Sequence, residues 1–431
     1  MLFTALFAAC TSAGDGSGGV NAGGANSGGT ESGDTGSFVP GPATDAVWDG
    51  DYLPVYRVTF PTDDWAAQLE AILPADQCAD RDYLEASVAY ENPESGETES
   101  YPRVGVRYRG HSSLREGQRF GFKLSFNEYD SAEEFHDLHN VNLMGTEGDF
   151  SLMRERLAQD IERELGVPAP RVNHVQLYVN DVYQGVFPFP EEQDDDPYLD
   201  HHFAEQTGGL YKVDGYCGGV ADFEDHGSDP EKYVDRYEPK ADTTTAQLQA
   251  DLFPLFACAA GSDSALATCL PTLVDVPEWL TEIAIDVVLP DVDGLAGVGQ
   301  NFMMYRNPTT GLLVVYPWDK DQSFSVSNAA SRSIWDLHPA WGTPPELTAR
   351  LRTVWKDDYC AEVLRVAALT TPGAMASRAE VLRTILAGPM ADDPWYPAND
   401  HTWKYDVKAL VDDFSDHHDE VVAEATACTP P

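Results

Sequence analysis

The chain has 431 residues, of which 42% are hydrophobic, and this is enough for one large domain or two ordinary ones with a substantial core. It carries 27 basic and 72 acidic side chains, which gives a formal net charge of −45 at pH 7. Such a charge argues against nucleic acid as a partner, because phosphate backbones are bound through lysine and arginine.

The first ten residues, MLFTALFAAC, form a short apolar run with small residues directly before Cys10. This run resembles the lipobox of a bacterial lipoprotein, so residues 1–10 are predicted to be a signal segment and Cys10 the lipidated residue. Residues 11–45 are rich in glycine and serine and are predicted to be a flexible tether. We therefore expect an exported lipoprotein of the outer membrane or cell surface, held at the membrane through its lipid anchor only.

Six cysteines remain when Cys10 is set aside: Cys78, Cys217, Cys258, Cys269, Cys360 and Cys428. An even number in an exported chain predicts disulfides, and the absence of any CxxC spacing argues against zinc. Cys258 and Cys269 are spaced to close a short loop, and Cys360 with Cys428 would staple the C-terminal segment. The sequence leaves the full pairing open.

Ordered structure is predicted from residue 46, with strand-like alternation at residues 55–60, 101–110 and 119–126. In the last of these runs, Lys123 lies on the opposite face from its apolar neighbours. Five cations fall within this region: Arg107, Arg109, Arg115, Arg119 and Lys123. In so acidic a chain, this cluster predicts a local positive field.

A helix is predicted over residues 152–165, because apolar residues recur there at four-residue spacing and Asp149 or Ser151 can cap its start. A β-hairpin is predicted over residues 174–190. The acidic run that follows, from Asp194 to Asp196, is expected to be a solvated surface.

Residues 215–272 are predicted to be a loop-rich insertion with little stable secondary structure before residue 244, and a buried helix follows over residues 277–289. From residue 331 onward the pattern is helical. The sequence therefore divides into an ordered domain over residues 46–330 and a helical C-terminal extension over residues 331–431, in which the pair His417-His418 is expected to be exposed.

The acids at two chain positions suggest a single site. Asp291 and Asp293 follow the buried helix, Asn301 begins a predicted hairpin, and Asp319 and Asp321 follow that hairpin. If the hairpin folds on itself, four carboxylates and one amide converge. Such carboxylates repel one another unless a hard divalent cation lies between them, and carboxylate and amide oxygens are ligands of Mg²⁺. A lysine for the phosphates and an aspartate that accepts a hydroxyl proton would complete a phosphoryl-transfer site.

The stretches VGVRYRGHSS, FKLSF, SLMRERLAQDIERELGVPAP, LYVNDVYQGVF, GGLYK and NFMMYRN…YPWDKDQSF resemble the CotH family of spore-coat protein kinases. The resemblance runs in order from about residue 52 to residue 326. It implies an α+β, atypical protein-kinase-like fold with a β-rich N-terminal lobe and a mixed C-terminal lobe. It also implies transfer of phosphate from ATP to serine of a protein substrate, with Mg²⁺ or Mn²⁺.

The resemblance implies that Lys123 contacts the phosphates of ATP and that Arg109 and Glu192 lie near the nucleotide. The helical partner of Lys123 stays open, with Glu155 as a candidate. Lys320 stands where the family usually has an apolar residue. We expect this to be tolerated, because alternate residues of a strand point to opposite sides.

The resemblance also implies that Asp319, with Asn301 and Asp321, holds the metal. It implies a catalytic aspartate after the buried helix, and both Asp293 and Asp291 stand at that place. Two other functions use the same fold. One is a non-catalytic surface or coat scaffold that binds partners through loops such as 215–245, and the other is a calcium-stabilised adhesin that uses the same carboxylates without a nucleotide.

Overall fold

The computed structural model describes residues 47–430, apart from residues 49, 51, 112, 115–118, 146–148, 195 and 399–401. The predicted signal segment with Cys10, the tether over residues 11–45 and Arg115 lie outside the described residues. Helices and strands are mixed throughout the described part, so the predicted α+β class is confirmed.

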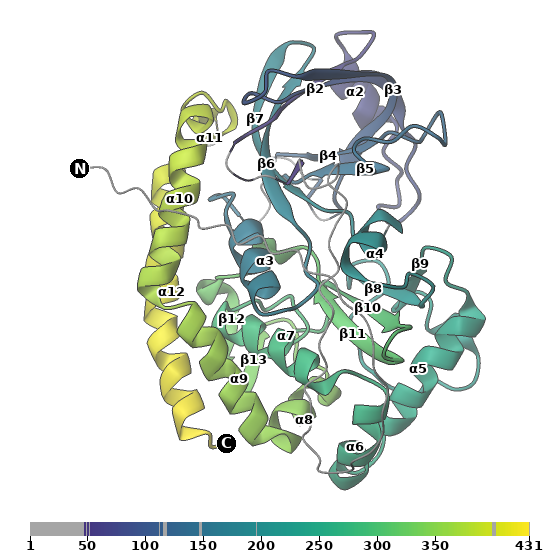
Figure 1. Ribbon diagram of the computed structural model, residues 1–431, viewed down its shortest axis with the longest axis vertical. Coiled ribbons are helices and arrows are strands. Elements are labelled where there is room, and N and C mark those ends of the chain that lie inside the picture. Colours follow the sequence, from purple (N-terminus) through teal and green to yellow (C-terminus); the bar gives the residue numbers. More distant parts are fainter. Residues whose placement is uncertain are drawn as a thin grey trace, which may run out of the picture. The chain divides into compact units, whose positions relative to one another are not determined.

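Seven strands form the N-terminal sheet, in the order β5-β4-β3-β2-β1-β6-β7 (Figure 1). Their bounds are Val55–Thr59 (β1), Leu84–Glu91 (β2), Thr98–Arg109 (β3), Gly121–Ser125 (β4), Asn140–Leu143 (β5), Val172–Val179 (β6) and Val182–Pro190 (β7). Neighbouring strands are antiparallel except β1 and β6, which are parallel. The edges of the sheet approach each other, because the N–H of Met144 donates to the carbonyl of Pro188 over 2.8 Å. The sheet thereby encloses an aromatic core that includes Tyr56, Phe135 and Phe189.

The predicted helix after this sheet is α3, Arg154–Glu164. The N-cap residue is Met153 and has no side-chain capping bond, but the predicted residues Asp149 and Ser151 bond N–H groups at the helix start. Asp149 accepts a hydrogen bond from the N–H of Arg154 over 2.8 Å, and the Ser151 hydroxyl accepts one from the N–H of Met153 over 3.2 Å. These bonds satisfy N–H groups that have no partner inside the helix, and so fix where α3 begins.

A second, small sheet has the strand order β11-β10-β8-β9. Its strands are Leu210–Val213 (β8), Glu238–Lys240 (β9), Phe302–Asn307 (β10) and Leu312–Pro317 (β11), and a separate hairpin consists of Ala329–Ser333 (β12) and Asp336–Pro339 (β13). The hairpin predicted over residues 301–318 is confirmed by β10 and β11, whose register pairs Phe302 with Pro317.

Helix α2 lies against β3 of the N-terminal sheet, whereas most of the other helices lie around the small sheet or beyond it (Figure 1). The helices not yet named are Trp65–Ala71 (α2), Asp196–His202 (α4), Thr245–Ala259 (α5), Asp263–Cys269 (α6), Val276–Val288 (α7), Glu346–Val354 (α8), Lys356–Leu369 (α9), Pro372–Ala391 (α10), Trp395–Ala398 (α11) and Trp403–Ala427 (α12). The helix α7 is buried along its length and packs against α9, on which α12 packs in turn. No described helix is both long and apolar enough to cross a bilayer.

The expectation that His417 and His418 are exposed is wrong. Both are buried, and their Nε2 atoms lie 2.8 Å from the carbonyl of Val287 in α7 and 2.9 Å from the carbonyl of Ala367 in α9, respectively. They lie on the face of α12 that covers these two helices. The sequence of α12 alone does not reveal that face.

Three disulfides join the six cysteines of the described part: Cys78–Cys217, Cys258–Cys269 and Cys360–Cys428. The two pairs that spacing favoured are therefore confirmed. The third links the segment between α2 and β2 to the segment that follows β8, and so connects the N-terminal sheet to the small sheet.

Candidate functional site

The two ends of the β10–β11 hairpin lie side by side. The N–H of Trp318 donates to the carbonyl of Asn301 over 3.1 Å, directly before Asp319. Asn301 and Asp319 both have left-handed backbones, with φ of 55° and 57°. This conformation costs a non-glycine residue about 1 kcal/mol or more, and such strain is concentrated at functional sites. The chain thus turns sharply at both residues, and each turn starts from a rigid strand.

Five carboxylates from three parts of the chain gather at these turns, and we call them the acid cluster: Asp149, Glu155, Asp293, Asp319 and Asp321. Burial raises the pKa of Asp321 well above its usual value, and the negative charges of the other four raise it further. Burial, followed by the charge of Asp319, also raises the pKa of Glu155 to about 8. Asp321 and Glu155 are therefore costly to ionise without a cation beside them.

Asp291 and Asp293 are adjacent in sequence but have different surroundings. Asp291 is only 1% exposed, and its carboxylate lies 3.4 Å from the Nζ of Lys320. It also accepts a hydrogen bond from the N–H of Asp293 over 3.0 Å, which holds the loop in shape. Asp293 is partly exposed, and its charge acts on Asp321. The structure therefore brings Asp293 to the acid cluster and turns Asp291 toward the core.

Lys320 lies in the core within a group of four buried carboxylates, which we call the lysine cage. The distances from its Nζ are 2.6 Å to Asp286, 3.2 Å to Glu282, 3.4 Å to Asp291 and 3.8 Å to Glu162. Burial alone would lower the pKa of Lys320, but these charges raise it well above its usual value. The expectation from strand alternation is wrong here, because the strand ends at Pro317 and the left-handed Asp319 turns the chain into a short 3₁₀ helix, Lys320–Gln322.

Lys123 is paired with Glu192, with 3.2 Å between Nζ and Oε2, and both side chains are largely buried. Asn142 of β5 donates a further hydrogen bond to the same carboxylate. Burial, and then the charge of Asp194, raises the pKa of Glu192. Glu155 lies near Asp319 instead, so among the described residues Lys123 forms its ion pair with the linker after β7 rather than with α3.

Two more lysines join Lys123 around Asp194. The Nζ of Lys240 lies 3.4 Å from the Asp194 carboxylate, and Lys212 lies 4.1 Å above the centre of the Trp318 ring. Burial alone would raise the pKa of Asp194, but its hydrogen bond with Glu192 and the charges of the three lysines hold it well below its usual value. The expectation that Asp194 is solvated is therefore wrong, whereas Asp195 lies outside the described residues.

The positive charge of Arg109, at the end of β3, affects the pKa of carboxylates both in the acid cluster and beside Lys123. This charge lowers the pKa of Glu155 in the acid cluster and the pKa of Glu192 beside Lys123. The acid cluster and the lysines are therefore neighbours, with Arg109 near both. A hard divalent cation fits the carboxylate and amide oxygens on one side, and a phosphate chain fits the cations on the other.

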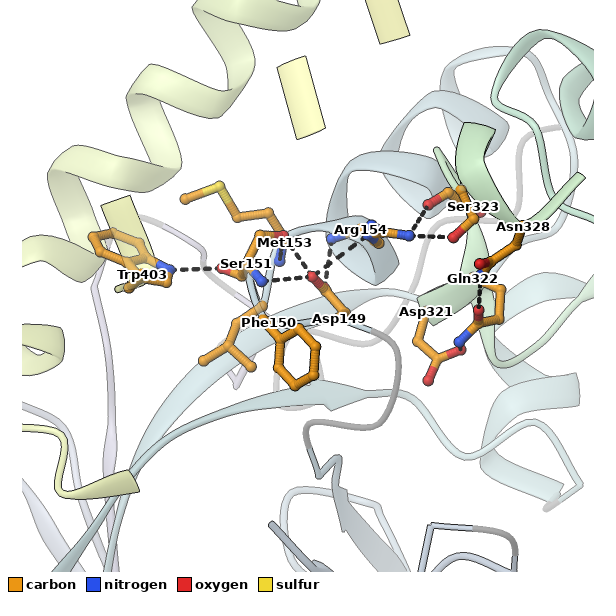
Figure 2. Close-up of polar contacts among 12 residues, drawn as sticks. Asp149, Phe150, Ser151, Met153, Arg154, Asp321, Gln322, Ser323, Asn328 and Trp403 are labelled. Atoms are coloured by element: carbon orange, nitrogen blue, oxygen red, sulfur yellow. Dashed lines mark hydrogen bonds and ion pairs between the residues drawn. The ribbon is translucent and has the colours of Figure 1, made fainter. Parts of the chain in front are cut away.

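The start of α3 is fixed to the segment that carries Asp321 (Figure 2). Arg154 donates to the carbonyl of Ser323 over 3.1 Å, while its own N–H is held by Asp149. From the other side, the indole of Trp403 in α12 donates to the carbonyl of Ser151 over 2.7 Å. The C-terminal helices therefore support the same short segment that brings Glu155 to the acid cluster.

A family model described as "CotH kinase protein" matches residues 106–418, which include Lys123, the lysine cage and every member of the acid cluster. The chain belongs to the CotH family. It is 26% identical to "Inner spore coat protein H" of Bacillus subtilis (strain 168), over 51% of this chain and 59% of that protein. It is 23% identical to "Invasin CotH7" of Rhizopus delemar, over 68% of this chain and 47% of that protein. The chain spans about half the length of these curated relatives.

Sequence reasoning missed Asp194, Lys212 and Lys240 and treated Asp149 only as a helix cap. The scarcity of cations was one signal that could have identified the lysines. Only 27 of 431 residues are lysine or arginine, so each cation in a predicted strand is a candidate for a functional role. No signal was available for Asp149, whose position depends on how the segment before α3 packs against residues 321–325.

Proposed function

We propose that this protein is an exported, metal-dependent phosphotransferase that moves the terminal phosphoryl group of ATP to a serine of a protein. One observation carries the proposal: a buried acid cluster lies next to a group of lysines, and Arg109 acts on both. Phosphoryl transfer needs this combination, because catalysis consists mainly of positioning the phosphates and neutralising their charge.

In this proposal Asp319, Asp321 and Asn301 hold Mg²⁺ or Mn²⁺, which supplies positive charge at the phosphates of ATP when it is bound. Lys123 binds the phosphates and is oriented by its ion pair with Glu192. Asp293 accepts the proton of the serine hydroxyl, since it is the partly exposed aspartate that faces the acid cluster.

A second function is favoured by the names of the relatives, a spore coat protein and an invasin. On that basis the chain would be a surface scaffold or a calcium-stabilised adhesin, and the acid cluster would bind calcium without a nucleotide. Both functions include export, which the three disulfides support, and anchoring through Cys10 is part of either proposal.

The test uses the purified full chain with labelled ATP, Mg²⁺ or Mn²⁺, and casein as a serine-containing acceptor. We expect label on casein or on the chain itself, and loss of that label in Asp319→Asn. The matched control is Asp357→Asn, an aspartate of α9 whose side chain is 90% exposed and which should leave transfer unchanged. Circular dichroism establishes that both variants are folded.

Two other outcomes refute the phosphotransferase. Absence of transfer together with a higher melting temperature in Ca²⁺, lost in Asp319→Asn, would support the adhesin. If the folded wild type responds neither to ATP nor to any divalent cation, the non-catalytic scaffold is the function that remains.

A further inference from the structure

The Cys78–Cys217 disulfide differs from the other two in its accessibility. Both of its cysteines are exposed, whereas each of the others includes a buried cysteine, Cys258 at 6% and Cys360 at 4% exposure. A reductant in solution therefore reaches Cys78–Cys217 first. This disulfide is also the one that connects the N-terminal sheet to the small sheet.

Two further metal-ligating side chains lie beside it. One ligand atom each of His111, Asp214 and Cys217 lie within 4.8 Å of one another. His111 follows β3 of the N-terminal sheet, whereas Asp214 follows β8 of the small sheet, directly after Val213. With Cys78, each side of the link between the two sheets offers two ligands.

These side chains are held in place by contacts other than the disulfide. The Asp214 carboxylate accepts a hydrogen bond from the N–H of Cys217 over 3.1 Å. The ring of His111 stacks on Tyr216, with centroids 5.6 Å apart, and the Tyr216 hydroxyl donates to Gln77 over 2.6 Å. The four ligands should therefore stay close together when the sulfur–sulfur bond is broken.

We propose that Cys78, Cys217, His111 and Asp214 form a zinc site when the disulfide is reduced, so that zinc and the disulfide are alternative links between the two sheets. A phosphine or thiol reductant supplies two electrons, the sulfur–sulfur bond breaks, and each sulfur takes one proton. Zinc then binds both sulfurs as thiolates and releases these two protons, while the reductant leaves in its oxidised form.

The geometry suits a tetrahedral zinc ion. With zinc–sulfur bonds of about 2.3 Å and zinc–nitrogen bonds of about 2.0 Å, neighbouring ligand atoms are about 3.3–3.8 Å apart. The ligand atoms of His111, Asp214 and Cys217 already lie within 4.8 Å of one another, and Cys78 is next to them, with its Cα 5.6 Å from that of Cys217. After reduction the two sulfurs must move apart to reach the tetrahedral spacing. Two thiolates and one carboxylate give the loaded site a net charge of −1, and the charges of Arg81 and Lys212, which reach His111, offset it. No CxxC spacing marks this site, because its ligands come from separate parts of the chain.

The test uses the oxidised full chain, opened by a limited amount of a phosphine reductant and loaded with Zn²⁺, or with Co²⁺ as a spectroscopic probe. With excess Mg²⁺ present to occupy the acid cluster, we expect one more equivalent of zinc per reduced chain than per oxidised chain. The cobalt form should show the absorption of tetrahedral thiolate coordination. Cys78→Ser/Cys217→Ser should abolish this binding, and His111→Ala should weaken it at least about tenfold.

The double variant Cys258→Ser/Cys269→Ser is the matched control and should keep its zinc after reduction, with circular dichroism confirming that it is folded. The proposal is overturned if the reduced wild type binds no more zinc than the oxidised chain. It is equally overturned if binding persists unchanged in Cys78→Ser/Cys217→Ser or in His111→Ala. None of these outcomes depends on phosphotransferase activity, so this test and the test of the proposed function fail independently.

Discussion

The lysine cage makes a quantitative prediction about stability. In Lys320→Met, a side chain of similar length removes the cation from a fully buried group of carboxylates, of which Asp286 is 2.6 Å away and Glu282 is 3.2 Å away. Removing one partner of a buried ion pair typically costs about 3–5 kcal/mol, because the remaining charges have no compensation. We expect a loss of this size in the free energy of unfolding at pH 8, measured by urea denaturation in the presence of a chelator.

The loss should depend on pH in a definite direction. Burial raises the pKa of Asp286 to about 7, although Lys320 opposes this rise, and burial raises the pKa of Glu282 as well. A carboxyl whose folded pKa is raised contributes stability below its unfolded pKa and loses that contribution as the pH rises through the folded pKa. Removal of Lys320 raises these pKa values further, so the penalty is largest at pH 8 and shrinks toward pH 5. Lys320 itself stays charged across this range.

Lys408→Met is the matched control, because the Lys408 side chain is 69% exposed on α12 and pairs only with Asp412 one turn away. We expect its unfolding free energy to stay close to that of the wild type at both pH values, because solvent screens an exposed ion pair. The reasoning is refuted if Lys320→Met is as stable as the wild type at pH 8, or if its penalty is the same at pH 5 and pH 8.

Three further predictions concern other parts of the molecule. Asp293→Asn should lower phosphate transfer by about 10²–10⁴-fold without loss of stability, and unchanged transfer would remove its proposed role. Asp291→Asn should instead lower the unfolding free energy, because Asp291 contacts Lys320. Burial lowers the pKa of His174 from 6.5 to about 4, so the stability that neutral His174 contributes above pH 6.5 should be lost as the pH falls toward 4. Relative to His174→Gln, which does not titrate, we expect a loss of about 3 kcal/mol in the free energy of unfolding. Parallel curves of stability against pH for the two proteins would contradict this. Asp393→Ala should lower the free energy of unfolding by about 3–5 kcal/mol, because Asp393 accepts a hydrogen bond from the N–H of Val186 and pairs with buried Arg119, each over 2.9 Å. Hydrogen exchange at the N–H of Val186 should also become faster. Exchange as slow as in the wild type would show that these contacts are unimportant.

Local patterns predicted the elements that carry the site. Period-two alternation located β4 and placed Lys123 on its less buried face, and four-residue spacing located α3, with Asp149 and Ser151 at its start. The β10–β11 hairpin also followed from a local pattern, and with it the meeting of Asn301 and the Trp318–Asp319 segment. These features depend on interactions within a few residues along the chain or across one turn.

Features that depend on packing between distant segments were not predictable in the same way. The partner of Lys123 is Glu192, which reaches it only because β4 and the end of β7 are brought together by the curled sheet. The position of Lys320 depends on the left-handed turn at Asp319, which ends strand alternation one residue before it. The burial of Asp194 also depends on distant segments. A run of acids is solvated unless cations from other strands lie against it, as Lys212 and Lys240 do here.

The acid cluster and the lysine cage differ in how their charges are balanced, although residues 319–321 contribute to both. In the cage, each carboxylate lies between 2.6 and 3.8 Å from the Nζ of Lys320, so the protein supplies the cation itself. In the acid cluster, the largest charge effects on Asp321 all come from other carboxylates. Since repulsion of this kind is stable only when it is offset, a cation from solution fits the acid cluster, whereas the cage already contains the cation of Lys320. This contrast supports our proposal that Asp319 and Asp321 bind the metal, and that Lys320 holds the loop of Asp291 and Asp293 in place.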